Sequence, residues 1–559
     1  MKQAIANLLF VILLSACTKE KSPKPNPTPT PTAKIPYVAG STLNSIEFNA
    51  TIKGTNLQPQ IKISFTQPLK TATASAVLLK DNVGNTVPIT TTFSNGDSAI
   101  NIAPTAALSH LTQYNLTISS SLQSLSGGAF SAAYTGSFVT SLDLSRKFPA
   151  ITDAELLTKV QQQTFKYFWD FAHPVSGLAR EGSKHPGNIA TIGGSGFGIM
   201  ALLVGIERGF ITKAQGLQRL QTIVEFLKNT AQTFHGAFPH WLDGATGVII
   251  PFSANDNGAD MVETSFLIQG LFTARQYFSA TDAAEAALRA DINTIINRVE
   301  WNWFQQNNQS VLYWHWSPDK AWVMNHKIQG WNEALITYVL AASSTNYSIP
   351  KTTYDAGWAR TGAIANGGNF YGYTLPLGEN FGGPLFFEHY SFLGINPNGL
   401  TDAYANYQTQ TKNHTLINYN YCKANPRAYY GYSDSVWGLT ASNIKGGYTA
   451  SSPTNDQSFI APTAALSSMP YTPNESMAAL KYFYYVLGDK IFKEYGFVDA
   501  FSLDVIKNNG AWYDDAFLAI DQGPIIVMIE NHRSQLLWNL FMSAPEVRAG
   551  LTKLGFTGF

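Results

Sequence analysis

The stretch that decides the fold is MVETSFLIQGLFTARQYF, residues 261–278. Its apolar residues occur around most of the helical circumference, which is typical of a helix buried on all sides. Residues 331–342 and 525–542 show the same pattern. Thr212 and Gln215 instead have the spacing of a capping box and introduce a helix with one apolar face. That face carries Leu217, Leu220, Ile223, Val224 and Leu227. Apolar inner helices and amphipathic outer helices therefore interleave along the chain.

This interleaving predicts an all-α domain over residues 142–559, an (α/α)6 toroid or barrel with a closed inner ring and a concave end. The pattern alone also allows an ordinary multilayer helical domain. Residues 364–433 are rich in Gly, Asn and Tyr, so we expect a long loop excursion there that walls a binding cleft.

The composition restricts the class of partner. The chain has 559 residues, with 37 basic and 37 acidic side chains, and only 13% of its residues are charged. A net charge of zero lacks the long-range attraction that nucleic acid or an anionic membrane surface would require. Its 12 Trp, 26 Tyr and 34 Phe supply rings that fill cores and stack on sugars. We therefore expect a monomer with a neutral partner.

The N-terminus has the features of an export signal. Residues 1–17 combine a basic start, an apolar run too short to cross a bilayer and the tetrapeptide LSAC at 14–17. That tetrapeptide resembles the bacterial lipobox, which implies acylation of Cys17 and anchoring in the outer membrane, on its periplasmic or cell-surface face. After removal of the signal only Cys422 is an unmodified cysteine, so no intramolecular disulfide can form.

Two further segments precede the helical region. Residues 18–34 contain alternating prolines, which favour an extended stalk. Residues 35–141 contain short alternating stretches at 61–65, 100–102 and 114–118, separated by turn signals, and predict a β-sandwich. This segment resembles bacterial Ig-like domains and carries no cluster of reactive side chains, so a spacer or a glycan-contacting module is expected.

Carboxylates at the starts of the apolar helices are the candidate catalytic groups. Zinc-hydrolase, serine-hydrolase and nucleotide-binding motifs are absent from the sequence, and we expect no metal and no cofactor. Asp256, Asp260, Glu333 and Asp521 each lie near the beginning of an apolar helix. Each of them is also an ordinary helix-capping position. In a toroid, however, those ends meet around one cleft, and glycoside hydrolysis needs a proton donor and a second carboxylate.

We assign the general acid to Glu333, because its aromatic surroundings should raise its pKa. Asp521 is the candidate base, and Asp256 and Asp260 would orient water or tune the pair, with one of them as the alternative base. Aromatic and imidazole side chains near these acids are either core residues or substrate contacts. They are Trp241, Trp314, Trp316, Trp331, Phe386, His389, Tyr390 and Trp437.

Five stretches carry a resemblance to a known family. They are residues 191–200 (TIGGSGFGIM), 313–318 (YWHWSP), 330–333 (GWNE), 382–390 (GGPLFFEHY) and 520–524 (IDQGP) with 529–531 (IEN). They resemble the bacterial glucoamylase-like domain, most closely glycoside hydrolase family 144, the endo-β-1,2-glucanases. The resemblance implies an (α/α)6 barrel that hydrolyses linear β-1,2-glucan to sophoro-oligosaccharides with inversion and without a metal. It matches Asp256, Asp260 and Glu333 to acidic positions implicated in activity, and Asp521 to the base position of a related family.

Three alternatives remain open at this stage. One is an exo-acting hydrolase on the same fold. Another is an enzyme for a different substrate, such as an α-glucan hydrolase or a uronate lyase. The third is a non-catalytic glycan-binding surface lipoprotein.

Overall fold

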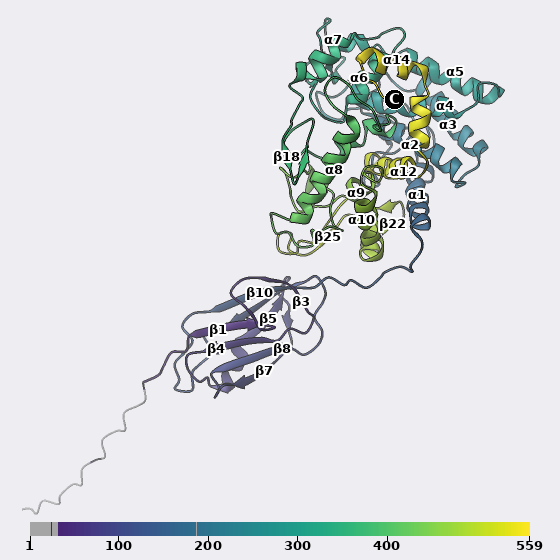
Figure 1. Ribbon diagram of the computed structural model, residues 1–559. Coiled ribbons are helices and arrows are strands. Elements are labelled where there is room, and N and C mark those ends of the chain that lie inside the picture. The colour runs from purple at the N-terminus through teal and green to yellow at the C-terminus, as the bar shows by residue number, and fades with distance from the viewer. Residues whose placement is uncertain (1–23, 25–31, 186) are drawn as a thin grey trace, which may run out of the picture.

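The computed structural model describes residues 24, 32–185 and 187–559 (Figure 1). The expected signal, Cys17 and most of the proline-rich stalk lie outside these residues, so the lipid anchor stays a prediction. Within the described residues, the longest apolar helices still fall short of what a membrane crossing requires.

The N-terminal region is a sandwich of two five-stranded sheets. One sheet contains, in chain order, β1 (Val38–Leu43), β2 (Ile46–Glu47), β4 (Ile61–Phe65), β7 (Ile89–Ser94) and β8 (Ala99–Pro104). The other contains β3 (Ile52–Thr55), β5 (Val77–Asp81), β6 (Thr86–Val87), β9 (Gln113–Ile118) and β10 (Tyr134–Thr140). Alternate residues such as Ile63, Leu116 and Phe138 are fully buried between the sheets, as half-buried strands require. The predicted Ig-like sandwich is confirmed.

The C-terminal region is a ring of inner elements enclosed by outer helices (Figure 1). The inner elements are α2 (Ile192–Glu207), α4 (Met261–Tyr277), α6 (Leu335–Ser343), the short helices η5 (Leu385–Glu388) and η6 (Ser391–Leu393), α9 (Pro462–Leu466) and α12 (Ala519–Ser534). Helix α12 packs back against α2 and closes the ring. The outer helices are α1 (Asp153–Trp169), α3 (Lys213–Asn229), α5 (Ala283–Asn297), α8 (Tyr407–Ala424), α10 (Pro473–Tyr485) and α14 (Pro545–Leu554). The predicted (α/α)6 toroid is confirmed.

Small residues set the closest contact in the ring, between α2 and α4. A Cβ atom on Gly196 would collide with the backbone of Phe266, and one on Gly270 would collide with the backbone of Gly196. The two backbones therefore pass at a distance that only glycine permits. Every residue of α4 from Met261 to Arg275 is buried, as its sequence predicts.

Three expectations about individual elements were wrong. The apolar stretch 331–342 becomes helical only at Leu335. The stretch 525–542 is broken at Gln535, whose positive φ of 60° ends α12 before α13 (Leu536–Met542). Residues 364–433 are not one loop, because they contain α8, η5 and η6. Helix α8 lacks an apolar pattern since its buried face carries polar side chains that bond to neighbouring segments, among them Gln410, His414 and Asn418.

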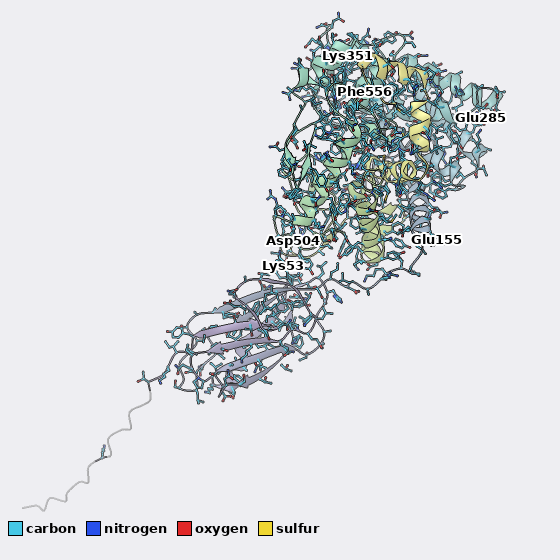
Figure 2. The ribbon with its side chains drawn as sticks, in the orientation of Figure 1. Lys53, Glu155, Glu285, Lys351, Asp504 and Phe556 are labelled. Atoms are coloured by element: carbon cyan, nitrogen blue, oxygen red, sulfur yellow. The ribbon has the colours of Figure 1, made fainter. Side chains whose placement is uncertain are left out.

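The two regions meet at β3. Lys53 Nζ donates to the carbonyl oxygen of Ala428 at 2.5 Å. Figure 2 shows Lys53 and Asp504 on facing sides of this junction.

Candidate active site

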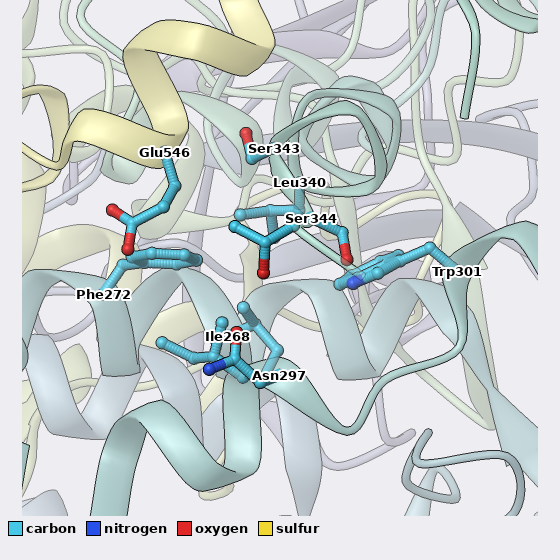
Figure 3. A pocket seen from close by; sticks show the side chains of 10 residues that line it. Ile268, Phe272, Asn297, Trp301, Leu340, Ser343, Ser344 and Glu546 are labelled. Atoms are coloured by element: carbon cyan, nitrogen blue, oxygen red, sulfur yellow. The ribbon is translucent and has the colours of Figure 1, made fainter. Parts of the chain in front are cut away.

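One cleft lies at the end of the ring where α2, α4 and α12 begin. Its volume is about 420 Å³. The residues that line it are Glu181, His185, Thr191, His240, Trp241, Phe252, Glu263, Asn443, Tyr448, Leu518 and Ile520. A second hollow, between Trp301, Leu340 and Glu546, holds only about 10 Å³ (Figure 3). That space admits one water molecule at most, whereas the first cleft is lined by His240, which contacts the candidate acid Asp260.

Asp260 and Asp256 lie beside this cleft in a cluster with two histidines. Asp260 caps α4, and its Oδ1 accepts hydrogen bonds from the N–H groups of Val262 and Glu263, each at 2.9 Å. Its Oδ2 lies 3.2 Å from His240 Nδ1. Strand β14 (Ala259–Asp260) pairs with β16 (His315–Trp316), which brings His315 Nε2 to 3.4 Å from Asp256 Oδ2.

Opposing effects set the charges in this cluster. Burial and the nearby charge of Asp260 raise the pKa of Asp256 to about 7. Burial would lower the pKa of His240, but the charge of Glu263 and the contact with Asp260 raise it to about 10. Despite its burial, the bond from His240 keeps the pKa of Asp260 below its usual range. Ligand atoms of His240, Asp256 and Asp260 lie within 4.8 Å of one another.

Glu333 lies just before α6 and is held there through its neighbours. The hydroxyl of Ser391 donates to the carbonyl oxygen of Glu333 and accepts from the N–H of Ile336 at 3.0 Å. Burial raises the pKa of the Glu333 carboxyl to about 7, and the charge of Asp260 adds to the effect. A substantial fraction of Glu333 is therefore protonated at neutral pH, as a proton donor requires.

Asp521, in the first turn of α12, belongs to a buried carboxyl pair with Asp499. Burial, then the charge of Asp499 and a hydrogen bond with it, raise the pKa of Asp521 well above its usual value. Asp499 Oδ2 accepts from the N–H of Asn443 at 2.6 Å. The two remaining oxygens, Asp499 Oδ1 and Asp521 Oδ2, have no other hydrogen-bond partner among the described residues. The pair is therefore best described as sharing one proton and carrying one negative charge.

Tyr390 shows that these acids converge. Burial raises the pKa of its hydroxyl well above the usual value, and the charges of Asp521, Glu333 and Glu263 raise it further. Those carboxylates come from the starts of α12, α6 and α4. The fold thus brings two of the acids selected from the sequence, Glu333 and Asp521, near one tyrosine, and Asp260 acts on Glu333.

The selected aromatic residues separate into two groups. Trp241 lines the cleft, half-buried, with its ring 4.8 Å from that of Phe252. Phe386 stacks on Tyr390 at 5.1 Å. Trp314 and Trp316 are half-buried beside the histidine cluster, where Trp314 stacks on His326 and Trp316 packs edge-on against Trp303.

Three of the expected substrate contacts were wrong. Trp437 is fully buried, and its Nε1 donates to the carbonyl oxygen of Glu475. His389 is 1% exposed and bonds to Ser468, and burial lowers its pKa to about 3. Trp331 is 7% exposed and its Nε1 donates to Glu388 Oε1 at 3.0 Å. These side chains are core and positioning groups that leave no face free for a sugar.

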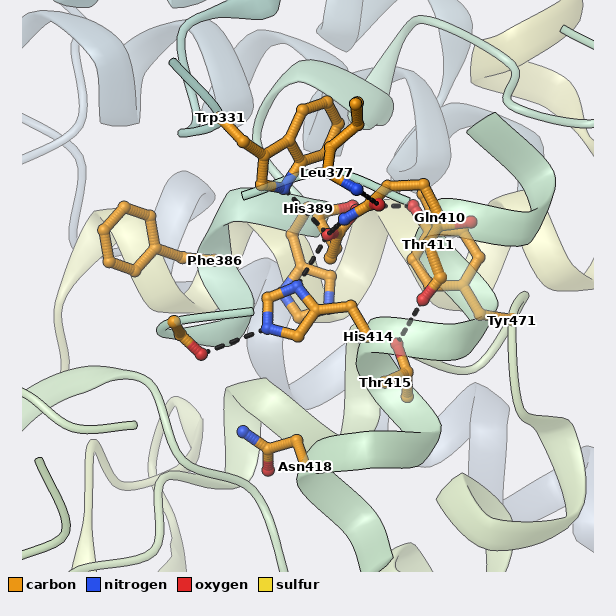
Figure 4. Close-up of polar contacts among 12 residues, drawn as sticks. Trp331, Leu377, Phe386, His389, Gln410, Thr411, His414, Thr415, Asn418 and Tyr471 are labelled. Carbon is orange, nitrogen blue, oxygen red and sulfur yellow. Dashed lines mark hydrogen bonds and ion pairs between the residues drawn. The ribbon is translucent and has the colours of Figure 1, made fainter. Parts of the chain in front are cut away.

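Trp331 belongs to a buried polar network with Gln410 and His414 (Figure 4). Glu388 Oε1 accepts from Trp331 Nε1, from Gln410 Nε2 at 2.9 Å and from His414 Nδ1 at 2.6 Å. The network fastens the segment that carries Glu333 to η5 and α8. A sequence-level assignment of Trp331 to the substrate could not anticipate this role.

Several residues of the site were missed. Glu263 is 7% exposed, and burial together with the charge of Asp260 raises its pKa to about 7. Its spacing of three residues from Asp260 was a usable signal, because both positions face the start of α4. His240 precedes Trp241 directly and could have been included with it. Asp499 and Tyr448 had no local signal, since each reaches the site from a loop or hairpin distant in sequence.

Comparison with known proteins places this fold and site in a family. Residues 325–545 match the family model described as "Putative glucoamylase", and residues 40–140 match the bacterial Ig-like domain. A structure of endo-β-1,2-glucanase from Chitinophaga pinensis, in complex with sophorotriose and glucose, is 53% identical. The match covers 73% of this chain and 99% of that one, with a TM-score of 0.70. A β-1,2-glucanase structure from Parabacteroides distasonis is 38% identical over 94% of this chain and 74% of that one, with a TM-score of 0.70.

A curated relative from Parabacteroides distasonis has a different stated mode of action. It is an exo β-1,2-glucooligosaccharide sophorohydrolase acting at the non-reducing end. The two chains are 46% identical over 425 residues, which is 72% of this chain and 58% of the relative. The chain thus spans little more than half the length of that relative.

The fold and the ring of acids define an (α/α)6 glycoside hydrolase preceded by an Ig-like domain. The chain belongs to the bacterial glucoamylase-like family, of the type of glycoside hydrolase family 144.

Proposed function

We propose that the protein hydrolyses β-1,2-glucan. The observation that carries the proposal is the convergence of Glu333 and the Asp499–Asp521 pair on Tyr390 beside a cleft of about 420 Å³. The linkage is supported by the relatives whose stated activities concern β-1,2-glucans. A neutral polysaccharide also suits a chain with no net charge.

The chemistry is an inverting acid–base hydrolysis. Glu333 donates its proton to the glycosidic oxygen as the bond to the anomeric carbon breaks. A water molecule attacks that carbon from the opposite face and gives its proton to the Asp499–Asp521 pair. The pair begins with one proton and one negative charge and ends with two protons, so it acts as a base as a unit. Asp260, held ionised by His240, stabilises the positive charge that develops on the sugar ring.

Asp256 and Glu263 have a tuning role in this scheme. Both have pKa values near 7 because of burial and the charge of Asp260. Their protonated forms donate hydrogen bonds to sugar hydroxyls, whereas their ionised forms accept them. Trp241 supplies the stacking surface for a glucosyl unit.

The mode of attack is endo in this proposal, with release of short sophoro-oligosaccharides. The 53% identity to the endo-β-1,2-glucanase over 99% of its length supports this assignment. The second candidate is exo action, which the stated activity of the 46% identical relative favours. We further propose that Cys17 is acylated and anchors the protein to the outer membrane, with the stalk and the Ig-like domain as spacers.

The test incubates the soluble chain from residue 35 onward with β-1,2-, β-1,3-, β-1,4- and α-linked glucans and resolves product length and anomeric form. The proposal predicts α-anomeric oligomers of several lengths from the β-1,2-glucan alone. Release of a single short product would establish exo action instead. Activity confined to another linkage would overturn the proposed substrate.

A further inference from the structure

The β20–β21 hairpin faces Trp241 across the cleft and has no assigned role. Strand β20 (Ala441–Ile444) pairs with β21 (Gly447–Ala450). Tyr448, near the tip, lines the same cavity as Trp241 and Phe252. Its side chain is 55% exposed, and its hydroxyl has no hydrogen-bond partner among the described residues. A large ring exposed to a mainly apolar cavity that also holds a few polar groups is the arrangement of a ligand contact.

Hydrogen bonds fasten the hairpin along its length. The N–H of Asn443 donates to Asp499 at 2.6 Å, and Asn443 Nδ2 donates to Asp514 Oδ2 at 2.8 Å. Lys445 Nζ donates to the carbonyl oxygen of Asn508 at 2.6 Å. On the return strand, Asn455 Nδ2 donates to the carbonyl oxygen of Ala450 at 2.9 Å. The ring is thus presented by an ordered scaffold, so binding loses little conformational entropy.

The opposite wall carries a complementary surface. The rings of Trp241 and Phe252 lie 4.8 Å apart, and the ring of His240 lies 4.3 Å from that of Phe252. Phe252 is itself 49% exposed. Aromatic surfaces therefore border the cleft on both sides, while Glu263 supplies a carboxyl between them.

We propose that Tyr448 is a specificity-determining residue that stacks on a glucosyl unit and clamps it against the Trp241–Phe252 wall. The occupant is a neutral β-1,2-linked glucosyl unit of the substrate chain, so this inference depends on the proposed function. The C–H faces of a glucosyl ring are apolar and its rim is hydroxylated. The apolar faces match the two aromatic walls, and the hydroxylated rim matches the polar groups between those walls. The hairpin also connects this clamp to the proposed catalytic base, the Asp499–Asp521 pair, because the N–H of Asn443 donates to Asp499.

The test measures binding of β-1,2-linked glucooligosaccharides by calorimetry in a Glu333→Gln background, so that the ligand is not consumed. Adding Tyr448→Ala should raise the dissociation constant roughly tenfold, which is the order expected for the loss of one aromatic stacking surface. Adding Tyr448→Phe should leave it within about twofold, since the ring remains. Tyr371→Ala is the matched control, because Tyr371 is another exposed tyrosine at a hairpin turn, outside the residues that line the cleft.

A Tyr448→Ala variant that binds as tightly as its parent would overturn the clamp and leave the proposed function intact. Equal weakening by Tyr448→Ala and Tyr448→Phe would also overturn it, because the hydroxyl and not the ring would then matter. If the wild-type protein does not hydrolyse β-1,2-glucan and the Glu333→Gln variant does not bind its oligosaccharides, the proposed function itself fails. Thermal unfolding of each variant verifies that this exposed position does not affect folding.

Discussion

His414 Nδ1 lies 2.6 Å from Glu388 Oε1, and neither side chain is exposed. The other ring nitrogen of His414 faces the carbonyl oxygen of Gly383 at 3.1 Å. Both ring nitrogens therefore face an oxygen atom, and the ring is fixed in place from both sides. The same carboxylate oxygen accepts from Trp331, so the pair holds the segment that carries the proposed acid.

Substitution of Glu388 by Gln should destabilise the protein by roughly 1–3 kcal/mol, because a neutral amide cannot serve the three buried groups of Trp331, Gln410 and His414 that contact the carboxylate. Denaturant unfolding measures this change. Asp515→Asn is the control, since the Lys184–Asp515 pair is exposed, with 57% and 80% of the two side chains accessible. Its loss should cost less than about 1 kcal/mol. Equal losses of stability from the two substitutions would contradict a stabilising role for the buried contact between Glu388 and His414.

Gly193→Ala should displace Glu263 from the start of α2. A Cβ atom at this position would lie 2.5 Å from Glu263 Oε2, the oxygen that accepts from the N–H of Gly193 at 2.6 Å. We expect a loss of about 1–3 kcal/mol in the free energy of unfolding, typical of overpacking, together with reduced turnover. Gly40→Ala in β1 has no neighbour within 4 Å and should leave both unchanged. Unaltered turnover in Gly193→Ala would show that Glu263 has no role in the site.

Two tryptophans should respond oppositely to truncation. Trp437 is fully buried, so Trp437→Ala should destabilise the fold by about 3–5 kcal/mol and leave KM of the folded fraction unchanged. Trp241→Ala should raise KM severalfold with a smaller loss of stability, because Trp241 lines the cleft. Unfolding curves and steady-state kinetics separate the two effects. The converse pattern would reverse the assignment of these residues.

The pKa of Glu333, about 7, predicts an alkaline limb in the pH profile. The acid must be protonated to act, so kcat/KM should fall as the pH rises through about 7. The same shift affects stability. The folded protein binds this proton more tightly than the unfolded chain does. The free energy of unfolding is therefore highest below the pKa that Glu333 has in the unfolded chain, and it falls as the pH rises through the pKa that Glu333 has in the folded protein. Glu333→Gln should therefore show a smaller fall in stability between pH 5 and pH 8 than the wild type, by parallel unfolding measurements. Identical pH dependence would contradict a buried, protonated Glu333.

The sequence was sufficient for the architecture because its signal is local and repeated. The apolar circumference of residues 261–278 and the capping box at Thr212 each follow from neighbouring residues, and the structure contains both as expected. Helix α8 escaped prediction because its buried positions are polar and are satisfied by distant segments.

The candidate site likewise contains residues that have a local sequence signal and residues that have none. Asp256, Asp260, Glu333 and Asp521 were found because each lies near the start of an inner helix. The partner of Asp521 was not found, because Asp499 arrives from a loop 22 positions earlier (521 − 499) with no periodic context. Whether Trp437 faces a ligand or the core depends on packing across the ring, which no local pattern records.

The role of Glu333 as the proton donor is tested most directly by changing the leaving group. Glu333→Gln should lower kcat/KM on β-1,2-glucan by about 10²–10⁴-fold, the usual contribution of a general acid. On an aryl β-sophoroside with an acidic phenol, whose departure needs no protonation, the same variant should retain most of the wild-type rate. Asp521→Asn should lose activity on both substrates. Equal losses by Glu333→Gln on the polymer and on the aryl substrate would contradict the assignment of Glu333.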